Sequence, residues 1–490
     1  MHTKLMAAAL KTSEQLAGDR SSARTSACRR SLQVAVLVFL SAIYGQWAAA
    51  GTVGHVIHVS VDGLRGDYLE SRISSNPLLY SNFKRFVDEG ATTFNARTDY
   101  THTETLPNHT SMLTGRPVLQ PNGAPATVHH GYTNNGTPSP SDTLHNAGNP
   151  NVAYIASTFD QAHDHGLSTA LYASKDKFVI YEQSYNATAG APDTIGPDNG
   201  NDKIDTYVYM STGSPANASN LHAAYLADMV SSQYNYTFLH YRDPDSAGHA
   251  AGWGSATWDT SVQNVDDYLG DLFQLIENTP GLAGDTAIVL TADHGGTGTG
   301  HGTAATAANY TVPVMVWGPG VAPGADLYAL NPYFRLDPGA GRPEYTGVTQ
   351  PIRNGDTGNL ALELLGLTSI PGSLVNGFQE LDVASHYAAD FDGNQSVNQL
   401  DFANWEAGFG AWQNAQKNHG DADLDRDVDG FDFLTWQQEA GASLWPLVVS
   451  NAAPEPSALS VGLLAVLCSL GSRSIGFLSR PPGSQLLGQN

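Results

Sequence analysis

The sequence predicts an α/β fold for residues 51–380, because strand-like and helix-like segments alternate along this stretch. The strand candidates are rich in β-branched and aromatic residues and are bounded by turn residues; they are 55–61, 236–241, 286–292 and 312–317. Their nearly continuous apolar character is typical of strands buried on both faces, which predicts a largely parallel sheet. Residues 258–278 predict a helix, with one apolar face formed by Val262, Val265, Leu269, Leu272, Phe273 and Ile276.

The charge of the chain is uneven, and its distribution predicts a second domain. The formal net charge is −24 in 490 residues, which argues against a nucleic-acid-binding domain because phosphates would be repelled. Aspartates are concentrated after residue 386, so we expect a separate acidic module at 386–445. The two cysteines, Cys28 and Cys468, lie in terminal segments, so we expect no disulfide in the processed protein.

The first 50 residues carry a targeting pattern. Arg29 and Arg30 precede a short apolar run that ends at Ala50. A basic region followed by such a run and by small residues predicts a signal peptide over residues 1–50. An uncleaved N-terminal anchor is the alternative interpretation, although the apolar run is short for a membrane span.

A second targeting pattern occupies residues 452–482. The letters PEPS at 454–457 are followed by an apolar stretch and then by Arg473 and Arg480. This segment resembles the PEP-CTERM sorting tail of Gram-negative bacteria, and a plain tail anchor is the alternative. The resemblance implies an exported protein at the cell surface or outside the cell, with transient membrane contact through the tail.

The acidic module contains an internal repeat, 390–405 and 421–436, in which the acidic and aromatic residues coincide. Calcium takes six to eight oxygen ligands from a loop whose alternate residues point inward. The candidate calcium ligands are Asp390, Asp392, Asn394, Ser396, Asn398 and Asp401 in the first copy, and Asp421, Asp423, Asp425, Asp427, Asp429 and Asp432 in the second. The usual glycine at loop position 6 is replaced by Gln395 and Arg426, which is a departure from the EF-hand pattern.

This duplicated pattern resembles the type I dockerin module, in which aspartate closes an EF-hand-like calcium loop. The resemblance implies a small helical domain that folds on binding calcium. It also implies a cohesin-like protein partner, an expectation that has no support in the ligand pattern itself.

Acidic and histidine side chains follow several of the strand candidates. They are Asp62 after 55–61, Asp245 and His249 after 236–241, and Asp293, His294 and His301 after 286–292. Open α/β sheets place their active sites at the C-terminal ends of the strands. Mixed carboxylate and imidazole ligands suit zinc or a similar ion, and two such ions can clamp the oxygens of a phosphoryl transfer.

The stretch THTETLPNHTSMLTG at 101–115 supplies the hydroxyl groups for such chemistry. A hydroxyl coordinated to a metal ion loses its proton near neutral pH and becomes a nucleophile. We therefore expect one of these threonines to be the nucleophile.

Four motifs in order, VDGLRGDYL, TETLPNHTSMLTG, PDSAGH and TADHG, resemble the type I phosphodiesterase/nucleotide pyrophosphatase branch of the alkaline phosphatase superfamily. The resemblance implies a three-layer α/β/α sandwich and hydrolysis of a small phosphoester through a phosphothreonine. It implies Thr105 as the nucleophile and Asn108 as a hydrogen-bond donor to a phosphate oxygen. It further implies one zinc-type ion on Asp62, Thr105, Asp293 and His294, and a second on Asp245, His249 and His301.

Other functions stay open at this point. His301 is the least secure ligand, because animal members of the branch have their last histidine much further along the chain; His163 and His165 are rivals. Threonine also serves alkaline phosphomonoesterases and phosphonate hydrolases, so either activity is an alternative. A sulfatase is disfavoured, because residues 105–109 contain neither a formylglycine precursor nor the arginine of that pattern. A non-enzymatic calcium-dependent surface protein is the alternative from another class.

Overall fold

The computed structural model describes residues 53–193, 200–332, 334–347, 349–384, 387–391, 396–412, 415, 419–422 and 427–441. The predicted signal peptide and sorting tail lie outside these residues, as do Asp392, Asn394, Asp423 and Asp425 of the predicted calcium loops. Within the described part of the chain, no helix is both long and apolar enough to cross a bilayer.

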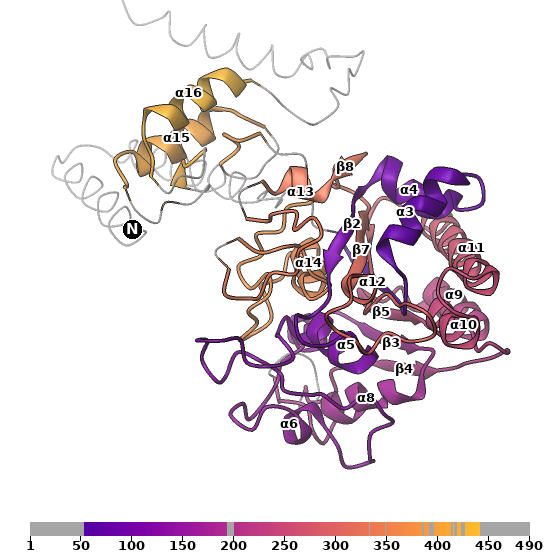
Figure 1. The fold of residues 1–490 in the computed structure, drawn as a ribbon. Coiled ribbons are helices and arrows are strands. Elements are labelled where there is room, and N and C mark those ends of the chain that lie inside the picture. Colours follow the sequence, from indigo (N-terminus) through magenta and orange to yellow (C-terminus); the bar gives the residue numbers. More distant parts are fainter. Residues whose placement is uncertain are drawn as a thin grey trace, which may run out of the picture. The chain divides into compact units, whose positions relative to one another are not determined.

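An eight-stranded sheet forms the centre of the first part of the chain (Figure 1), with the order β4-β3-β5-β1-β6-β7-β2-β8. The strands are β1 (His55–Val61), β2 (Ala91–Arg97), β3 (Thr169–Ala173), β4 (Thr206–Tyr209), β5 (Tyr236–Tyr241), β6 (Thr286–Thr291), β7 (Thr311–Trp317) and β8 (Ala325–Asp326). All four predicted strands are present. The five strands from β4 to β6 are parallel, which agrees with their continuous apolar sequences.

The prediction of a largely parallel sheet is confirmed, and β7 is the exception. This strand runs antiparallel to both of its neighbours, β6 and β2. Its sequence is as apolar as that of β1, because helices cover it as well, and burial rather than strand direction sets that composition. Apolar character alone therefore does not report direction.

Helices cover both faces of the sheet, as the α/β/α prediction requires (Figure 1). On one face lie α5 (Thr105–Thr114), α7 (Thr158–His163) and α14 (Asp356–Leu364). On the other lie α3 (Gly66–Ser75), α4 (Ser81–Glu89), α9 (Ser219–Ser232) and α11 (Ala256–Asn278), and α10 (Asp243–Ala251) packs on α11. Shorter helices connect these layers: α6 (Leu144–Ala147), η1 (Asp176–Phe178), α8 (Val179–Tyr185), α12 (Ala307–Tyr310) and α13 (Leu327–Leu330).

Helix α11 shows why the sequence folds as it does. All six apolar residues predicted for its inner face are buried, and the helix begins two residues before the predicted range. Ser255 caps its first turn by accepting a hydrogen bond from the backbone N–H of Trp258. The spacing of apolar residues along α11 thus determines which face of the helix packs against the core.

The acidic repeat contains two helices, α15 (Gln399–Gly408) and α16 (Gly430–Glu439). Their capping residues, Asn398 and Asp429, occupy equivalent positions of the two copies. A small apolar cluster of Ala389, Phe391, Val397 and Ala422 shares no residue with the main core, which extends from Val53 to Val383. The domain boundaries at 380 and 386 stay predictions.

Candidate active site: two carboxylate–histidine clusters

The site is built where the C-terminal ends of four adjacent parallel strands meet, in the order β3, β5, β1 and β6. Asp62 follows β1 directly, and Asp293 and His294 lie just beyond β6. Asp245 lies in the first turn and His249 in the last turn of α10, which begins two residues after β5. Because the ends of parallel strands share one edge, residues far apart in the sequence converge there.

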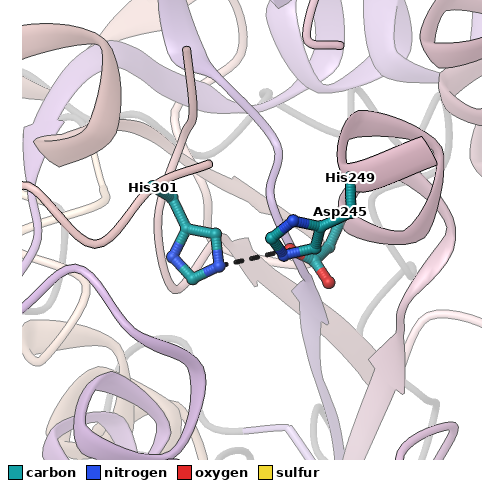
Figure 2. A group of neighbouring side chains, drawn as sticks. All are labelled: Asp245, His249 and His301. Atoms are coloured by element: carbon teal, nitrogen blue, oxygen red, sulfur yellow. Dashed lines mark ion pairs between the residues drawn. The ribbon is translucent and has the colours of Figure 1, made fainter. Parts of the chain in front are cut away.

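The structure gathers the predicted ligands into the two groups that the sequence suggested. The buried cluster is Asp62, Asp293 and His294, and the open cluster is Asp245, His249 and His301. Within each cluster the candidate ligand atoms lie within 4.8 Å of one another. In the open cluster, His301 Nε2 lies 3.6 Å and His249 Nε2 3.3 Å from Asp245 Oδ1 (Figure 2). The geometry therefore favours His301 over its rivals.

The rival histidines lie elsewhere. His163 groups with Asp164 and Asp193, and the Lys203 ammonium already lies 2.8 Å from Asp193 Oδ2. His165 Nδ1 donates to the carbonyl of Gln161. Neither histidine belongs to the buried or the open cluster.

Each cluster histidine is held in one tautomer by the backbone. The Nδ1–H groups of His249, His294 and His301 donate to the carbonyls of Thr299, Gly295 and Thr103, at 2.9, 2.8 and 2.6 Å. With the hydrogen on Nδ1, each Nε2 presents its lone pair to the cluster. Such orientation by an outer partner is typical of metal-ligating histidines.

The unpartnered atoms of the site are the observation that tests whether metal ions fit. Buried side-chain atoms without a hydrogen-bond partner include four from these clusters: Asp62 Oδ1, Asp245 Oδ1, Asp293 Oδ2 and His294 Nε2. Three carboxylate oxygens and an imidazole nitrogen left bare in the interior are costly unless a cation binds them. His294 Nε2 lies 3.3 Å from Asp293 Oδ2 and 3.5 Å from Asp62 Oδ1, so the bare atoms face one another. The donor set fits divalent ions.

Thr105 is the first residue of α5 and is almost fully buried. Its Oγ1 lies 3.4 Å from the Nζ atom of Lys175, a residue that the sequence analysis did not select. The same ammonium lies 2.6 Å from Asp62 Oδ2 and 2.6 Å from Asp245 Oδ2. The predicted nucleophile thus lies beside a buried cation that bridges the two clusters.

The protonation states follow from burial and these charges. Burial alone would lower the pKa of Lys175, but Asp245 and Asp62 outweigh it, so the pKa is raised and the lysine stays charged. Burial raises the pKa of Asp293 well above its usual range, and the charge of Asp62 adds to this. Burial lowers the pKa of His294 to about 3. A metal ion bound at Asp293 would take the place of the proton that burial favours on this carboxyl group.

Asn108 does not lie as the predicted phosphate donor should. Its Nδ2 donates to the carbonyls of His102 and Glu104, and its Oδ1 accepts from the backbone N–H of Asp99. Both amide hydrogens are therefore directed into the fold, and the geometry does not support the role implied for Asn108.

Asn135 is the better candidate for that contact. Its Oδ1 accepts from the backbone N–H of Leu106, at the N-terminus of α5, and from Lys177 Nζ at 3.0 Å. Because the side-chain oxygen of Asn135 makes these two contacts, its amide nitrogen is directed to a group bound beside Thr105. No sequence motif pointed to Asn135, whereas Lys175 lies two residues after the end of β3 and is found once that strand is recognised.

Trp253 packs between the segments that carry the ligands. Its Nε1–H donates to the carbonyl of Gly63 at 2.9 Å, and its ring centroid lies 5.4 Å from that of His249. A Cβ atom at Gly248 would lie 2.6 Å from the indole, and one at Gly296 would overlap it. Both glycines are therefore required by the close approach of this ring.

Comparisons with known proteins give a family match and distant structural neighbours. A sequence model described as "Type I phosphodiesterase / nucleotide pyrophosphatase" matches residues 56–310, just over half of the chain. No curated protein matches the sequence. Solved structures with a similar fold include murine ectonucleotide pyrophosphatase / phosphodiesterase 5, with 15% identity and a TM-score of 0.45 over 68% of this chain and 100% of that one. They also include the alkaline phosphatase PafA, with 13% identity and a TM-score of 0.46 over 68% of this chain and 99% of that one.

The family match spans the strands β1, β5 and β6, whose ends carry both clusters, together with Thr105. The chain belongs to the type I phosphodiesterase / nucleotide pyrophosphatase family and is a phosphoester hydrolase.

Proposed function

We propose that the protein hydrolyses a small phosphoester in two displacements, with Thr105 as the nucleophile and a zinc-type ion in each cluster. The observation that carries this proposal is the set of four bare ligand atoms beside the Thr105 hydroxyl. The buried cluster and Thr105 would hold one ion, and the open cluster would hold the other. When bound, such ions lower the pKa of a coordinated hydroxyl and neutralise charge on the phosphoryl oxygens.

In the first displacement, Thr105 Oγ1 bonds to phosphorus while the bond from phosphorus to the leaving alcohol breaks, which gives a phosphothreonine. In the second, a water oxygen bonds to phosphorus, the bond to Thr105 breaks, and inorganic phosphate or a phosphomonoester leaves. Lys175 and the N-terminus of α5 stabilise charge on the equatorial oxygens throughout. Asn135 orients the phosphoryl group through its amide nitrogen.

The sequence favours a phosphodiesterase or nucleotide pyrophosphatase, but one observation favours a phosphomonoesterase as the second candidate. The charged Lys175 is an extra cation close to Thr105. A monoester dianion presents more charge at its free oxygens than a diester does, so an additional buried cation helps it more. A phosphonate has the charge of the corresponding ester, and its hydrolysis is tested in the same assay.

The deciding experiment compares bis-p-nitrophenyl phosphate, p-nitrophenyl thymidine monophosphate, p-nitrophenyl phosphate and a p-nitrophenyl phosphonate, using zinc-loaded residues 51–450. Thr105→Ala serves as the control. Dominant diester cleavage that is lost in T105A supports the phosphodiesterase, and dominant monoester cleavage that is lost moves the enzyme to the phosphomonoesterases. Zinc-loaded protein that cleaves none of them would contradict the proposal and favour a surface binding role.

We also propose that the acidic repeat binds calcium. Asp427, Asp429 and Asp432 bring carboxylate oxygens within 4.8 Å of one another. Asp401 and Asp432 occupy equivalent positions, and each accepts the backbone N–H of the second loop residue, Phe391 or Ala422. Shared roles at shared positions support one ion site per copy.

The two copies also contact each other reciprocally. Trp405 Nε1 donates to the carbonyl of Asp429 at 2.9 Å, and Trp436 Nε1 donates to that of Asn398 at 3.1 Å. Calcium bound to one loop would therefore be sensed by an indole of the other copy. Titration with calcium should change the tryptophan fluorescence at two equivalents, and one equivalent is expected for Asp432→Ala; the absence of any calcium binding would contradict this proposal.

Export, processing of the tail and a cohesin-like partner are proposals that rest on sequence resemblance alone. Secretion of the full chain from a Gram-negative host, with mass spectrometry of both ends, tests the first two. Binding of the isolated cohesin-type domains to the full protein, with and without calcium, tests the third.

A further inference from the structure

His240 is a fully buried histidine at the end of β5 that no sequence motif singled out. Its Nε2 lies 3.0 Å from Asp62 Oδ2, across the pairing of β5 with β1. It is not one of the candidate ligands, because Asp62 Oδ2 lies between its ring and the buried cluster. The contact joins a side chain outside both clusters to a ligand inside one.

The hydrogen bonds of His240 fix its tautomer. The backbone N–H of Ser174 donates to His240 Nδ1 at 3.3 Å, and Ser174 Oγ lies 3.0 Å from the same atom. Because Nδ1 accepts a backbone hydrogen, the ring hydrogen of the neutral imidazole is on Nε2 and points at Asp62.

The two oxygens of Asp62 therefore have different surroundings. Oδ2 accepts from His240 and lies 2.6 Å from Lys175 Nζ. Oδ1 has no partner and faces His294 Nε2 at 3.5 Å. An ammonium group rotates freely and imposes no plane on a carboxylate, whereas an N–H in a packed ring is directional. The ring is packed against Phe178, with centroids 4.2 Å apart.

We propose that His240 is a positioning residue that fixes the carboxylate plane of Asp62, so that Oδ1 alone is presented to a metal ion in the buried cluster. This inference rests on the metal-dependent function proposed above and adds a residue to it. Outer partners of this kind typically change metal affinity by about 10–100-fold.

His58 provides a matched control on the same face of the sheet. It is also fully buried, and it pairs in register with Phe238, two residues before His240. Its ring nitrogens contact the hydroxyls of Tyr236 and Thr357, at 3.1 and 2.9 Å, and neither belongs to a cluster. A change at His58 therefore costs a buried hydrogen-bonded imidazole without touching Asp62.

The test replaces the histidine with glutamine or asparagine, whose amide side chains differ in length. His240→Gln places an amide N–H near the position of Nε2 and keeps a donor for Asp62. His240→Asn places its amide near Nδ1, toward Ser174, and leaves Asp62 without that donor. His58→Gln and His58→Asn repeat the change at the control position. His240→Met, which fills the space without a donor, replaces H240N if that variant does not fold.

Two readouts are measured on each full-length variant: the melting temperature without metal, and zinc affinity by competition with a chromophoric chelator. We expect H240N or H240M to weaken the buried-cluster zinc by about 10–100-fold and H240Q to stay within about threefold of wild type. Both His58 variants should lower the metal-free melting temperature yet bind zinc like wild type.

The outcomes separate this inference from the function on which it rests. Wild-type zinc affinity in H240N and H240M, or equal weakening in H240Q, would overturn the positioning role while the metal site stands. Loss of zinc affinity in the His58 variants would overturn it too, since general destabilisation would then be the cause. Wild-type protein that binds no zinc would remove both the inference and the metal-dependent function.

Discussion

The buried cluster and the open cluster contain the same kinds of ligand but differ in access to solvent. All three side chains of the buried cluster are fully inaccessible, whereas His249 of the open cluster is 48% exposed. The histidines of both are oriented by backbone carbonyls, so orientation is not what distinguishes them. The difference indicates a division of labour: the buried cluster suits activation of Thr105, and the open cluster is where water can enter.

The largest predicted effect is a difference in kcat/KM between a substitution in the buried cluster and one in the open cluster. Asp293→Asn removes a ligand from a site where no water can replace it, so kcat/KM should fall on the order of 10³-fold. His249→Asn opens a position that water can fill, and the loss should be at least tenfold smaller. Kinetics and zinc content of both variants check this, and equal losses would show that exposure does not distinguish the clusters.

Lys175 bridges the clusters, and its replacement should affect the substrates unequally. In Lys175→Met, kcat/KM for a monoester should fall on the order of 10²-fold, because a charged hydrogen bond to the transferred group is lost. The loss for a diester should be about tenfold or less on the same reasoning. Lys84→Met, which changes a partly exposed lysine paired with Asp88, is the control. Equal losses on both substrates would argue against a role in substrate choice.

Zinc affinity at the open cluster should fall more steeply with decreasing pH than zinc affinity at the buried cluster. The Asp245 carboxylate raises the pKa of His249, while burial lowers that of His294 to about 3. A metal binds the neutral imidazole, so affinity is complete above the raised pKa and falls as the pH drops through it, about tenfold per pH unit. Zinc titrations of wild type and His249→Asn at a series of pH values check this, and an unchanged slope in the variant would contradict it.

The smallest effect concerns the support of the open cluster. Thr103 Oγ1 donates to the carbonyl of His301, while the Thr103 carbonyl accepts from His301 Nδ1. Thr103→Val removes only the first contact, so zinc affinity of the open cluster should weaken by about threefold to tenfold. The affinity of the buried cluster should not change. A loss shared by both clusters would show that they are not independent.

The sequence predicted the strands, the long helix and the ligand groups because each depends on local patterns. Strand 55–61 is rich in β-branched residues and Asp62 follows it at once, so the position of that carboxylate could be predicted directly. The grouping of Asp245, His249 and His301 was implied by the family resemblance, and the structure brings these three side chains together.

The residues that sequence reasoning missed depend on tertiary contacts. Lys175 follows β3, a strand of five residues that is too short to stand out, and a buried lysine is unusual without acidic partners from other strands. His240 lies inside β5, where no motif distinguishes it from its neighbours. Asn108 was chosen from its motif, but its amide is used within the fold by carbonyls that only the folded loop brings near.

Trp253 has a consequence for the choice of metal. Its indole lies against Gly248 and Gly296, which belong to the segments carrying ligands of different clusters, and it hydrogen-bonds the loop after Asp62. The indole therefore acts as an aromatic spacer between the segments that carry the two clusters. Engineering the enzyme for a different pair of ions should start with the spacer, leaving every ligand as it is.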